Sequence, residues 1–298
     1  MLQNRLMLRA KNALRVRVPW LLFGVIRLAS KTVFFQKERA YLHGRIKDES
    51  GVQSLLFFTT IRCASQRNIS VLSRFHESMG GISLDLSKYF FHAGIHVREG
   101  TWNLEQSQKY LQPNGFFFGA VPGIPDQFDW SQFKVVVILR DPRDIMVSFF
   151  YSLAHAHTPS DAEFANDSRE AREEGLEWFV RQKKRLDMVG SECRDRIRRF
   201  WNKPGVFCRR YEDMMSSYDG FISDLSDYLE LPQEAEGLKQ EIIEEQHASA
   251  PAGNKEDLLS HRRAGNAGQF REKLSSDAVK FLNMEFADIL EVLEYETP

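Results

Sequence analysis

Three short segments combine arginines with small or hydroxyl side chains, which are residue types that bind anions. The first, residues 59–68, reads TTIRCASQRN and ends the apolar stretch SLLFFTT. A strand, a polar turn and a helix in this order direct backbone N–H groups and the positive helix end at one point. The kinase-type loop G-x-x-x-x-G-K-[ST] is absent, so an anion site of another type is predicted. An ordinary helix start with surface arginines is the alternative.

The second segment, residues 140–148, reads RDPRDIMVS and directly follows the apolar stretch KVVVIL. Arg140 ends this predicted strand, and Ser148 lies two turns into the helix that follows. A guanidinium fork and a hydroxyl in this arrangement bind a phosphate. An Asp-Pro helix cap with a solvated charge pair would explain Asp141 and Pro142, but not Arg140 with Ser148.

The third segment, residues 262–270, reads RRAGNAGQF. Its glycines let the backbone approach an anion closely, and its arginines supply charge. Taken alone, a loop of this composition is more often plain surface.

The elements that must position these segments alternate along the chain. Apolar runs predict strands at 54–60, 116–119, 134–139 and 206–209. Helices are predicted at 67–79, from about 142, between 212 and 245, and at 276–293. The densely charged stretch 160–200 is predicted to form solvated helices of a cap or insertion. Residues 246–270 are predicted to form a long loop. Alternating strands and helices predict a parallel sheet covered on both faces, with ligands at the carboxyl ends of its strands.

Composition excludes several classes of protein. The 298 residues are 43% hydrophobic and 27% charged, as in an average soluble globular protein. Forty basic and 41 acidic residues nearly cancel, which argues against a general nucleic-acid binder. Three cysteines without a C-x-x-C pair favour a reducing, cytoplasmic compartment. No H-E-x-x-H motif is present, and no metal site is predicted.

The N-terminal part differs in charge from the rest. Residues 1–47 contain eleven Lys and Arg and one acidic residue, Glu38. Their apolar stretch, residues 18–26, is far shorter than the roughly 20 residues that a membrane span needs. Residues 1–50 are therefore expected to form a basic helical segment packed on, or preceding, a domain at 51–298. Peripheral contact with a lipid surface and an organelle-targeting peptide remain alternatives.

Taken together, the segments resemble the sulfotransferase family that uses 3'-phosphoadenosine 5'-phosphosulfate (PAPS). Residues 61–66 resemble its P-[KR]-[ST]-G-[ST]-[TS] loop around the 5'-phosphosulfate. Residues 140–148 match its R-[ND]-P-x-D-x-x-x-S element for the 3'-phosphate throughout. Residues 263–270 match its R-K-G-x-x-G-[DQ]-W loop with two substitutions, and residues 211–213 match its Y-E-D. The resemblance covers about residues 54–290.

This resemblance implies an α/β fold, a P-loop-like three-layer sandwich with a central parallel sheet and a helical insertion. It also implies metal-free, in-line transfer of a sulfuryl group from PAPS, the co-substrate, to a hydroxyl or amine of a small-molecule or glycan acceptor. Arg62 and the loop N–H groups would stabilise charge on the bridging and leaving oxygens. The residues implied in nucleotide binding are Arg62, Cys63, Ala64, Ser65, Gln66, Arg67, Arg140, Ser148, Tyr211, Arg263 and Gly265.

The chain departs from the family pattern in its loop and its base. Ala64 stands where glycine is usual, so the loop is expected to avoid a left-handed backbone there. Ile61 replaces a proline, and Arg67 replaces a frequent aromatic residue. The family's T-H-x-P histidine has no counterpart in the nearest stretch, 118–122.

A general base must therefore come from elsewhere, and Asp85 is the preferred candidate. It lies about as far after the loop as the catalytic carboxylate of another family branch, although a plain helix-cap aspartate is equally consistent. His92 is the second candidate and His96 the third, while His157 resembles an element that borders the acceptor pocket. The predicted catalytic set is Arg62, Asp85 and His92.

Two other functions stay open at this point. A nucleotide-dependent kinase on a similar fold is disfavoured by the missing Lys-[ST]. A non-catalytic relative that binds the nucleotide but has lost its base is the other.

Overall fold

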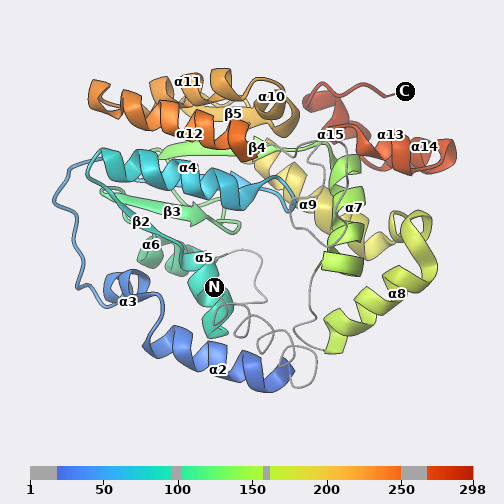
Figure 1. Cartoon of the computed structure of the whole chain (residues 1–298), viewed down its shortest axis with the longest axis horizontal. Coiled ribbons are helices and arrows are strands. Elements are labelled where there is room, and N and C mark those ends of the chain that lie inside the picture. The colour runs from blue at the N-terminus through green and yellow to red at the C-terminus, as the bar shows by residue number, and fades with distance from the viewer. Residues whose placement is uncertain (1–18, 96–101, 157–161, 250–266, 298) are drawn as a thin grey trace.

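A computed structural model describes residues 19–95, 102–156, 162–249 and 267–297 (Figure 1). Within them, five strands form one parallel sheet. Its order is β2 (Ile82–Leu84), β3 (Phe116–Ala120), β1 (Leu55–Thr59), β4 (Lys134–Leu139) and β5 (Val206–Arg210). The four predicted strands and their parallel arrangement are confirmed.

The three central strands, β3, β1 and β4, are mostly apolar because both faces of the sheet are buried there. Successive side chains alternate between the faces, so Leu55 and Phe57 of β1 join one hydrophobic core, while Leu56 and Phe58 join the other. The two cores hold the sheet as the middle layer of three.

One outer layer contains the helix that follows β1. It is formed by α4 (Ser65–Ser78), α10 (Tyr211–Ser216), α11 (Tyr218–Leu229) and α12 (Glu236–Ser249). The opposite layer is formed by α5 (Leu86–Ala93), α6 (Leu104–Tyr110), α7 (Pro142–Tyr151) and α9 (Lys183–Phe200). In Figure 1, α11 and α12 lie on one side of the strands, with α5 and α6 on the other. The predicted three-layer sandwich is therefore confirmed.

The charged stretch 160–200 divides between two environments. A π-helical turn (Ser152–Ala156) leads to α8 (Ala162–Phe179), whose backbone leaves the helical conformation at Gly175. In α9, by contrast, one face is apolar, and its Phe200 ring stacks on Phe58 of β1 with centroids 4.4 Å apart. The expectation of solvated helices across the whole stretch is therefore wrong for α9, which covers the sheet.

Three other boundaries differ from those expected. Strand β2 was not predicted, because three residues are too few to show a pattern. The region expected as a loop from 246 begins with the end of α12. The expected C-terminal helix is divided into α14 (Ser276–Glu285) and α15 (Ala287–Val292), because buried Phe286 leaves the helical conformation between them.

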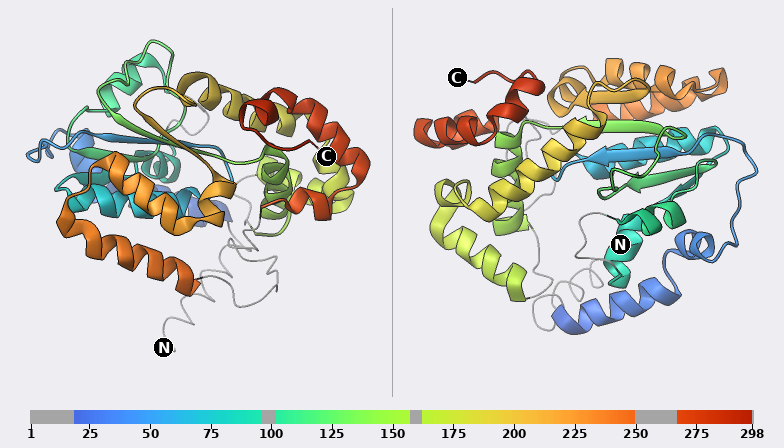
Figure 2. Two further views of the ribbon diagram at one scale, coloured as in Figure 1. Left: turned by 90° about the horizontal axis from the view of Figure 1, so that it is seen from above. Right: turned by 180° about the vertical axis from the view of Figure 1, so that it is seen from behind.

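The described N-terminal part consists of α2 (Pro19–Thr32) and α3 (Gln36–Leu42), and α2 packs beside α5 (Figure 2). Across the described ranges, no helix combines the length and hydropathy that crossing a bilayer requires. The domain boundary at residue 50 stays a prediction.

Candidate active site

The loop between β1 and α4 has an unusual backbone. Arg62 and Ala64 both have left-handed conformations, with φ of 65° and 54°. Ala64 is also the N-cap residue of α4, and its methyl side chain caps no N–H group. The expectation that the loop avoids a left-handed backbone at Ala64 is therefore wrong, and the alanine adopts the conformation for which glycine is usual.

This geometry fits a bound anion. Left-handed residues in a turn direct successive N–H groups into one concavity. The first turn of α4 contains no acidic residue and has no side-chain cap, so its N–H groups and dipole are open to a negative charge. Half-buried Ser65 and exposed Gln66 begin the helix. The loop therefore suits an anionic group.

Arg140 joins this loop to the second motif. Its side chain is buried, and its Nη1 donates to the carbonyl oxygen of Arg62 at 3.0 Å. Its Nη2 lies 3.5 Å from the Asp144 carboxylate, and its guanidinium lies over the Tyr211 ring, 4.5 Å from the centroid. The ends of β1, β4 and β5 are thus held together by one side chain.

A second contact joins the same two motifs. The Nε of Arg62 donates to the Ser148 hydroxyl at 3.1 Å. The structure therefore brings Arg62, Arg140, Ser148 and Tyr211 together, as the motifs predicted.

Asp144 ties the third motif to the second, although the sequence analysis did not assign it a role. This buried carboxylate accepts hydrogen bonds from the N–H groups of Gly268 at 2.8 Å and Phe270 at 3.0 Å. Both residues flank the start of α13 (Gln269–Lys273). Burial raises the pKa of Asp144, and the Arg140 charge and the two N–H groups oppose that shift. The match of this aspartate to the second D of R-[ND]-P-x-D was the available signal.

Asp141 and Arg143 are not the solvated charge pair that the alternative interpretation supposed. Asp141 does cap α7, with Pro142 following it, but Arg143 is only 1% exposed. Its Nη2 binds the Asp141 carboxylate at 2.7 Å, its Nη1 donates to Asn283 at 2.7 Å, and its guanidinium lies over the Phe270 ring. Arg143 therefore fixes α7 against the C-terminal helices.

The middle residue of Y-E-D braces the same region. Glu212 accepts from the N–H of Asp141 at 3.2 Å and from the Tyr295 hydroxyl. It also lies 4.0 Å from the Nε of Arg140. Burial raises the pKa of Glu212, and the Tyr295 hydrogen bond is the main opposing effect.

Two other residues of the predicted nucleotide set point their side chains elsewhere. Cys63 is fully buried, its sulfur lies 2.9 Å from the Thr60 hydroxyl, and burial raises its pKa to about 11. Its side chain therefore belongs to the hydrophobic core. Arg67 is half-buried on α4, with its Nη1 3.3 Å from the sulfur of Met215.

The proposed bases lie at the two ends of α5, Asp85 directly after β2 and His92 in the last turn of the helix. Asp85 is the N-cap of α5, its Oδ1 accepts from the N–H of Lys88 at 3.0 Å, and burial raises its pKa. His92, on α5, stacks on Phe35, and burial together with the Lys88 charge lowers its pKa. The predicted residues His96, His157, Arg263 and Gly265 lie outside the described residues.

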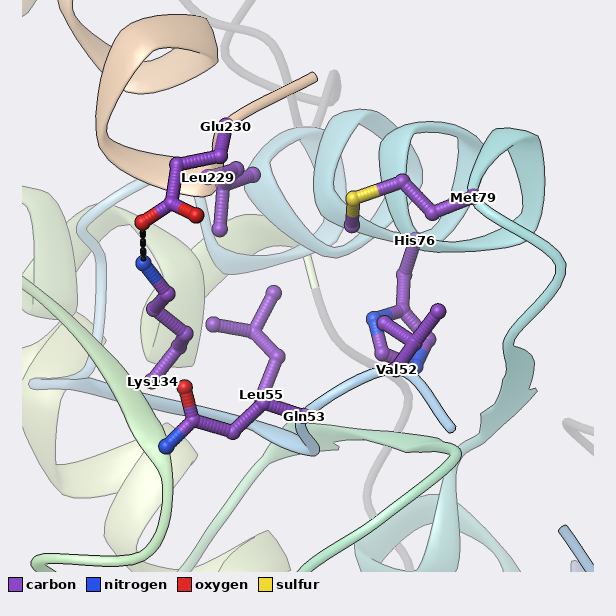
Figure 3. Close-up of a pocket in the computed structure, with 8 residues that line it drawn as sticks. All are labelled: Val52, Gln53, Leu55, His76, Met79, Lys134, Leu229 and Glu230. Carbon is purple, nitrogen blue, oxygen red and sulfur yellow. Dashed lines mark hydrogen bonds and ion pairs between the residues drawn. The ribbon is translucent and has the colours of Figure 1, made fainter. Parts of the chain in front are cut away.

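A cavity of about 210 Å³ lies at the opposite ends of the strands (Figure 3). It is lined by Val52, Gln53, Leu55, His76, Met79, Lys134, Leu229 and Glu230. Lys134 and Leu55 begin their strands, so this cavity is separate from the motifs. Among the residues that the structure describes, no group of His, Cys, Asp or Glu side chains could hold a metal ion.

A parallel sheet with an anion-binding loop after its central strand, and an arginine after the neighbouring strand, is typical of proteins that bind a nucleotide at the carboxyl ends of their strands. The sequence profile of the Sulfotransferase domain matches residues 118–292, which is more than half of the chain. The chain therefore belongs to the sulfotransferase domain family.

Solved structures resemble the chain at low sequence identity. Retinol dehydratase in complex with retinol and PAP (3',5'-bisphosphoadenosine) is 16% identical, with a TM-score of 0.45 over 89% of this chain and 88% of that chain. Mouse sulfotransferase SULT7A1 complexed with PAP is 13% identical, with a TM-score of 0.47 over 88% and 94%. Retinol dehydratase with androsterone and the inactive cofactor PAP is 18% identical, with a TM-score of 0.47 over 89% and 87%. No curated protein sequence matches the chain.

Family membership confirms the resemblance drawn from the motifs. The chain is a PAPS-dependent sulfotransferase with an α/β fold, and PAPS is its co-substrate. The kinase and the non-catalytic relative are set aside.

The left-handed alanine predicts the effect of a glycine. A left-handed conformation costs an L-residue about 1–2 kcal/mol, which exceeds the roughly 0.4–1 kcal/mol that extra chain freedom removes from a glycine variant. Ala64→Gly should therefore leave the free energy of unfolding in urea unchanged or raise it by up to about 1 kcal/mol. The control Ala40→Gly, inside α3, should lower it by about 0.5–1 kcal/mol. Equal losses in both variants would contradict the assigned backbone.

The two arginines of the second motif should differ in what they support. Arg140→Ala should weaken binding of PAP by about 2–5 kcal/mol in calorimetry, because Arg140 contacts the loop directly. Arg143→Ala should have a smaller effect on affinity but lower the free energy of unfolding by about 3–5 kcal/mol, since it leaves Asp141 buried without its partner. Equal affinities of the two variants for PAP would show that Arg140 has no special role in binding the nucleotide.

Proposed function

We propose that the chain transfers the sulfuryl group of PAPS to the hydroxyl of an apolar small-molecule acceptor. The observation that carries the proposal is the pair of contacts between motifs. Arg140 donates to the Arg62 carbonyl, and Arg62 donates to Ser148. Because β1 and β4 are neighbours about 4.8 Å apart, these contacts support one nucleotide held at its 5' and 3' ends.

Arg62 and the loop N–H groups bind the transferring group in this proposal. Their positive charge and dipoles stabilise the negative charge that develops on the bridging and leaving oxygens. Arg140, Ser148 and Tyr211 orient the nucleotide, together with Arg263 and Gly265 of the third motif. Positioning and electrostatics then supply most of the acceleration.

Asp85 is the proposed general base. It directly follows β2, two strand spacings or about 10 Å from β1, so an acceptor group fits between them above the end of β3. A carboxylate whose pKa is raised by burial is a stronger base near neutral pH. An alcohol requires such a base because its own acidity is negligible.

The surroundings favour an apolar acceptor over a glycan. The segment after β3 reads VPGI, with Val121 and Ile124 buried. Across α5, the side chains of Leu86, Tyr89 and Phe90 are also buried and apolar. These side chains belong to the hydrophobic core behind the expected acceptor site, which offers few partners for the many hydroxyls of a sugar.

The free cysteines support a reducing compartment. Cys63, Cys193 and Cys208 form no disulfide, and the first two are buried. A cytoplasmic location, which the composition predicted, remains our proposal.

We also propose that the N-terminal helices contact an anionic lipid surface. Seven large apolar side chains are exposed in the described residues, and five of them, Val25, Leu28, Val33, Phe34 and Phe91, lie on α2, on the turn after it and on α5. Residues 1–47, which contain the first four of these side chains, have eleven basic residues and one acidic residue. Exposed apolar side chains within basic sequence are typical of interfacial helices.

Co-sedimentation with vesicles tests this contact. Binding to phosphatidylserine vesicles should exceed binding to phosphatidylcholine vesicles and weaken in high salt. Leu28→Asp with Phe34→Asp should abolish it, whereas Met284→Asp, at an exposed apolar residue elsewhere, should not. Equal binding to the two kinds of vesicle would refute the contact. An equal loss of binding in Met284→Asp would refute it as well.

A nucleotide melting panel tests the proposed function. PAP at about 100 times its dissociation constant should stabilise the protein by roughly 2.7 kcal/mol, because the site has contacts for its 3'-phosphate. ADP and ATP lack that phosphate and should shift the melting temperature far less. Equal shifts for PAP and ADP would reject the assignment.

Replacement of the proposed base should affect turnover more than folding. Asn is as good an N-cap as Asp, so Asp85→Asn should keep α5 intact and leave binding of PAP nearly unchanged. It should lower kcat by about 10²–10⁴-fold, with a smaller effect from His92→Ala.

The pH dependence gives a second measure of Asp85. Because burial raises the pKa of Asp85, wild-type kcat should fall as pH falls through that raised value, and the Asn variant should lose this limb. A raised pKa in the folded state also means that the stability contributed by Asp85 is present at low pH and lost as pH rises through that value. The Asn variant should thus be no less stable at neutral pH. An unchanged kcat in Asp85→Asn would show that another residue is the general base.

A further inference from the structure

Glu192 of α9 reaches the anion-binding loop from the sheet face opposite α4. Its Oε2 accepts from the N–H of Ile61, with oxygen and nitrogen 3.4 Å apart. Glu192 is partly buried, and burial raises its pKa against the opposing charge of Arg196. No step described above uses this carboxylate.

The hydrogen bond from Ile61 to Glu192 lies at the start of a loop whose backbone conformation must be held by its surroundings. Two of its residues, Arg62 and Ala64, are left-handed without being glycine, and such a backbone persists only where its surroundings fix it. Arg140 holds the Arg62 carbonyl at 3.0 Å, and Asn68 holds the Cys63 carbonyl at 3.2 Å. Both contacts are hydrogen bonds to carbonyl oxygens in the middle of the loop. Neither of them restrains a backbone N–H group.

Ile61 is the point where the chain leaves β1 and enters the left-handed turn. Glu192 provides the restraint on its N–H group, which proline at this position would lack. Partial burial limits the access of water to the Ile61 N–H group, so water does not readily replace the carboxylate as its partner. The hydrogen bond therefore depends on the position that α9 gives to Glu192. The rigid position of α9 follows from Val189, Cys193 and Phe200, which are fully buried against the sheet.

We propose that Glu192 is a positioning residue for PAPS: by accepting from the Ile61 N–H, it holds the loop in the conformation that binds the 5'-phosphosulfate. The inference rests on the proposed role of the loop. Glu192 touches neither the nucleotide nor the acceptor in this role and acts through the Ile61 peptide. Its loss should therefore raise the KM for PAPS and weaken nucleotide binding, while kcat at saturating PAPS changes little.

Calorimetric titration with PAP tests the proposal without an acceptor. Glu192→Ala should weaken binding about tenfold, the size of one hydrogen bond to a charged group. Glu192→Gln keeps an acceptor oxygen and should recover most of that loss. Asp187→Ala, at an exposed carboxylate paired with Lys183 on the same helix, should bind like wild type.

The background variant Ile61→Pro separates a hydrogen bond from a general packing effect. Proline removes the N–H group, so Glu192→Ala should have no further effect on affinity in Ile61→Pro. A tenfold loss in both backgrounds would overturn the proposal, and so would an unchanged affinity of Glu192→Ala in the wild-type background.

Two further outcomes are decisive. If Ile61→Pro does not fold, the difference between Glu192→Gln and Glu192→Ala decides, and equal losses in the two refute the role of an accepting oxygen. If the wild-type protein does not bind PAP, the proposed function itself is wrong. If the wild-type protein binds PAP and Glu192→Ala binds it equally well, only the role of Glu192 is wrong.

Discussion

The site depends on one hydrogen bond, from the buried guanidinium of Arg140 to the carbonyl oxygen of Arg62. The acceptor belongs to a glycine-free loop with two left-handed residues, and the donor belongs to the end of the neighbouring strand. The contact therefore couples a strained loop to the rigid centre of a parallel sheet. A loop held in this way presents its N–H groups to an anion with little reorganisation on binding.

A buried arginine needs partners, and these partners connect the rest of the site. Asp144 faces Arg140 and holds the N–H groups that begin α13, while Glu212 approaches it from the end of β5. Breaking a buried ion pair leaves a desolvated charge, so the members of this cluster are mutually dependent. The three sequence motifs are thus joined through carboxylates, in addition to facing one ligand.

The sequence predicted the parts of the structure that rest on regular patterns. Continuous apolar runs marked β1, β3, β4 and β5, and polar turns after strands marked Arg62 and Arg140. It did not reveal β2, which has three residues, or the left-handed Ala64, because neighbouring contacts override the intrinsic preference of alanine. The role of Asp144 was hidden as well, since its partners are backbone N–H groups about 125 residues away along the chain.

Burial raises the pKa of four carboxylates in the described residues: Asp85, Asp144, Glu192 and Glu212. All four lie near the carboxyl ends of the strands, where perturbed groups mark functional sites. Three of them are engaged in holding the scaffold: Asp144 by two N–H groups, Glu212 by Asp141 and Tyr295, and Glu192 by Ile61. Asp85 differs because its side chain accepts through Oδ1 from an N–H group of the helix that it caps. Of the four, it is the carboxylate best able to take a proton without releasing part of the site.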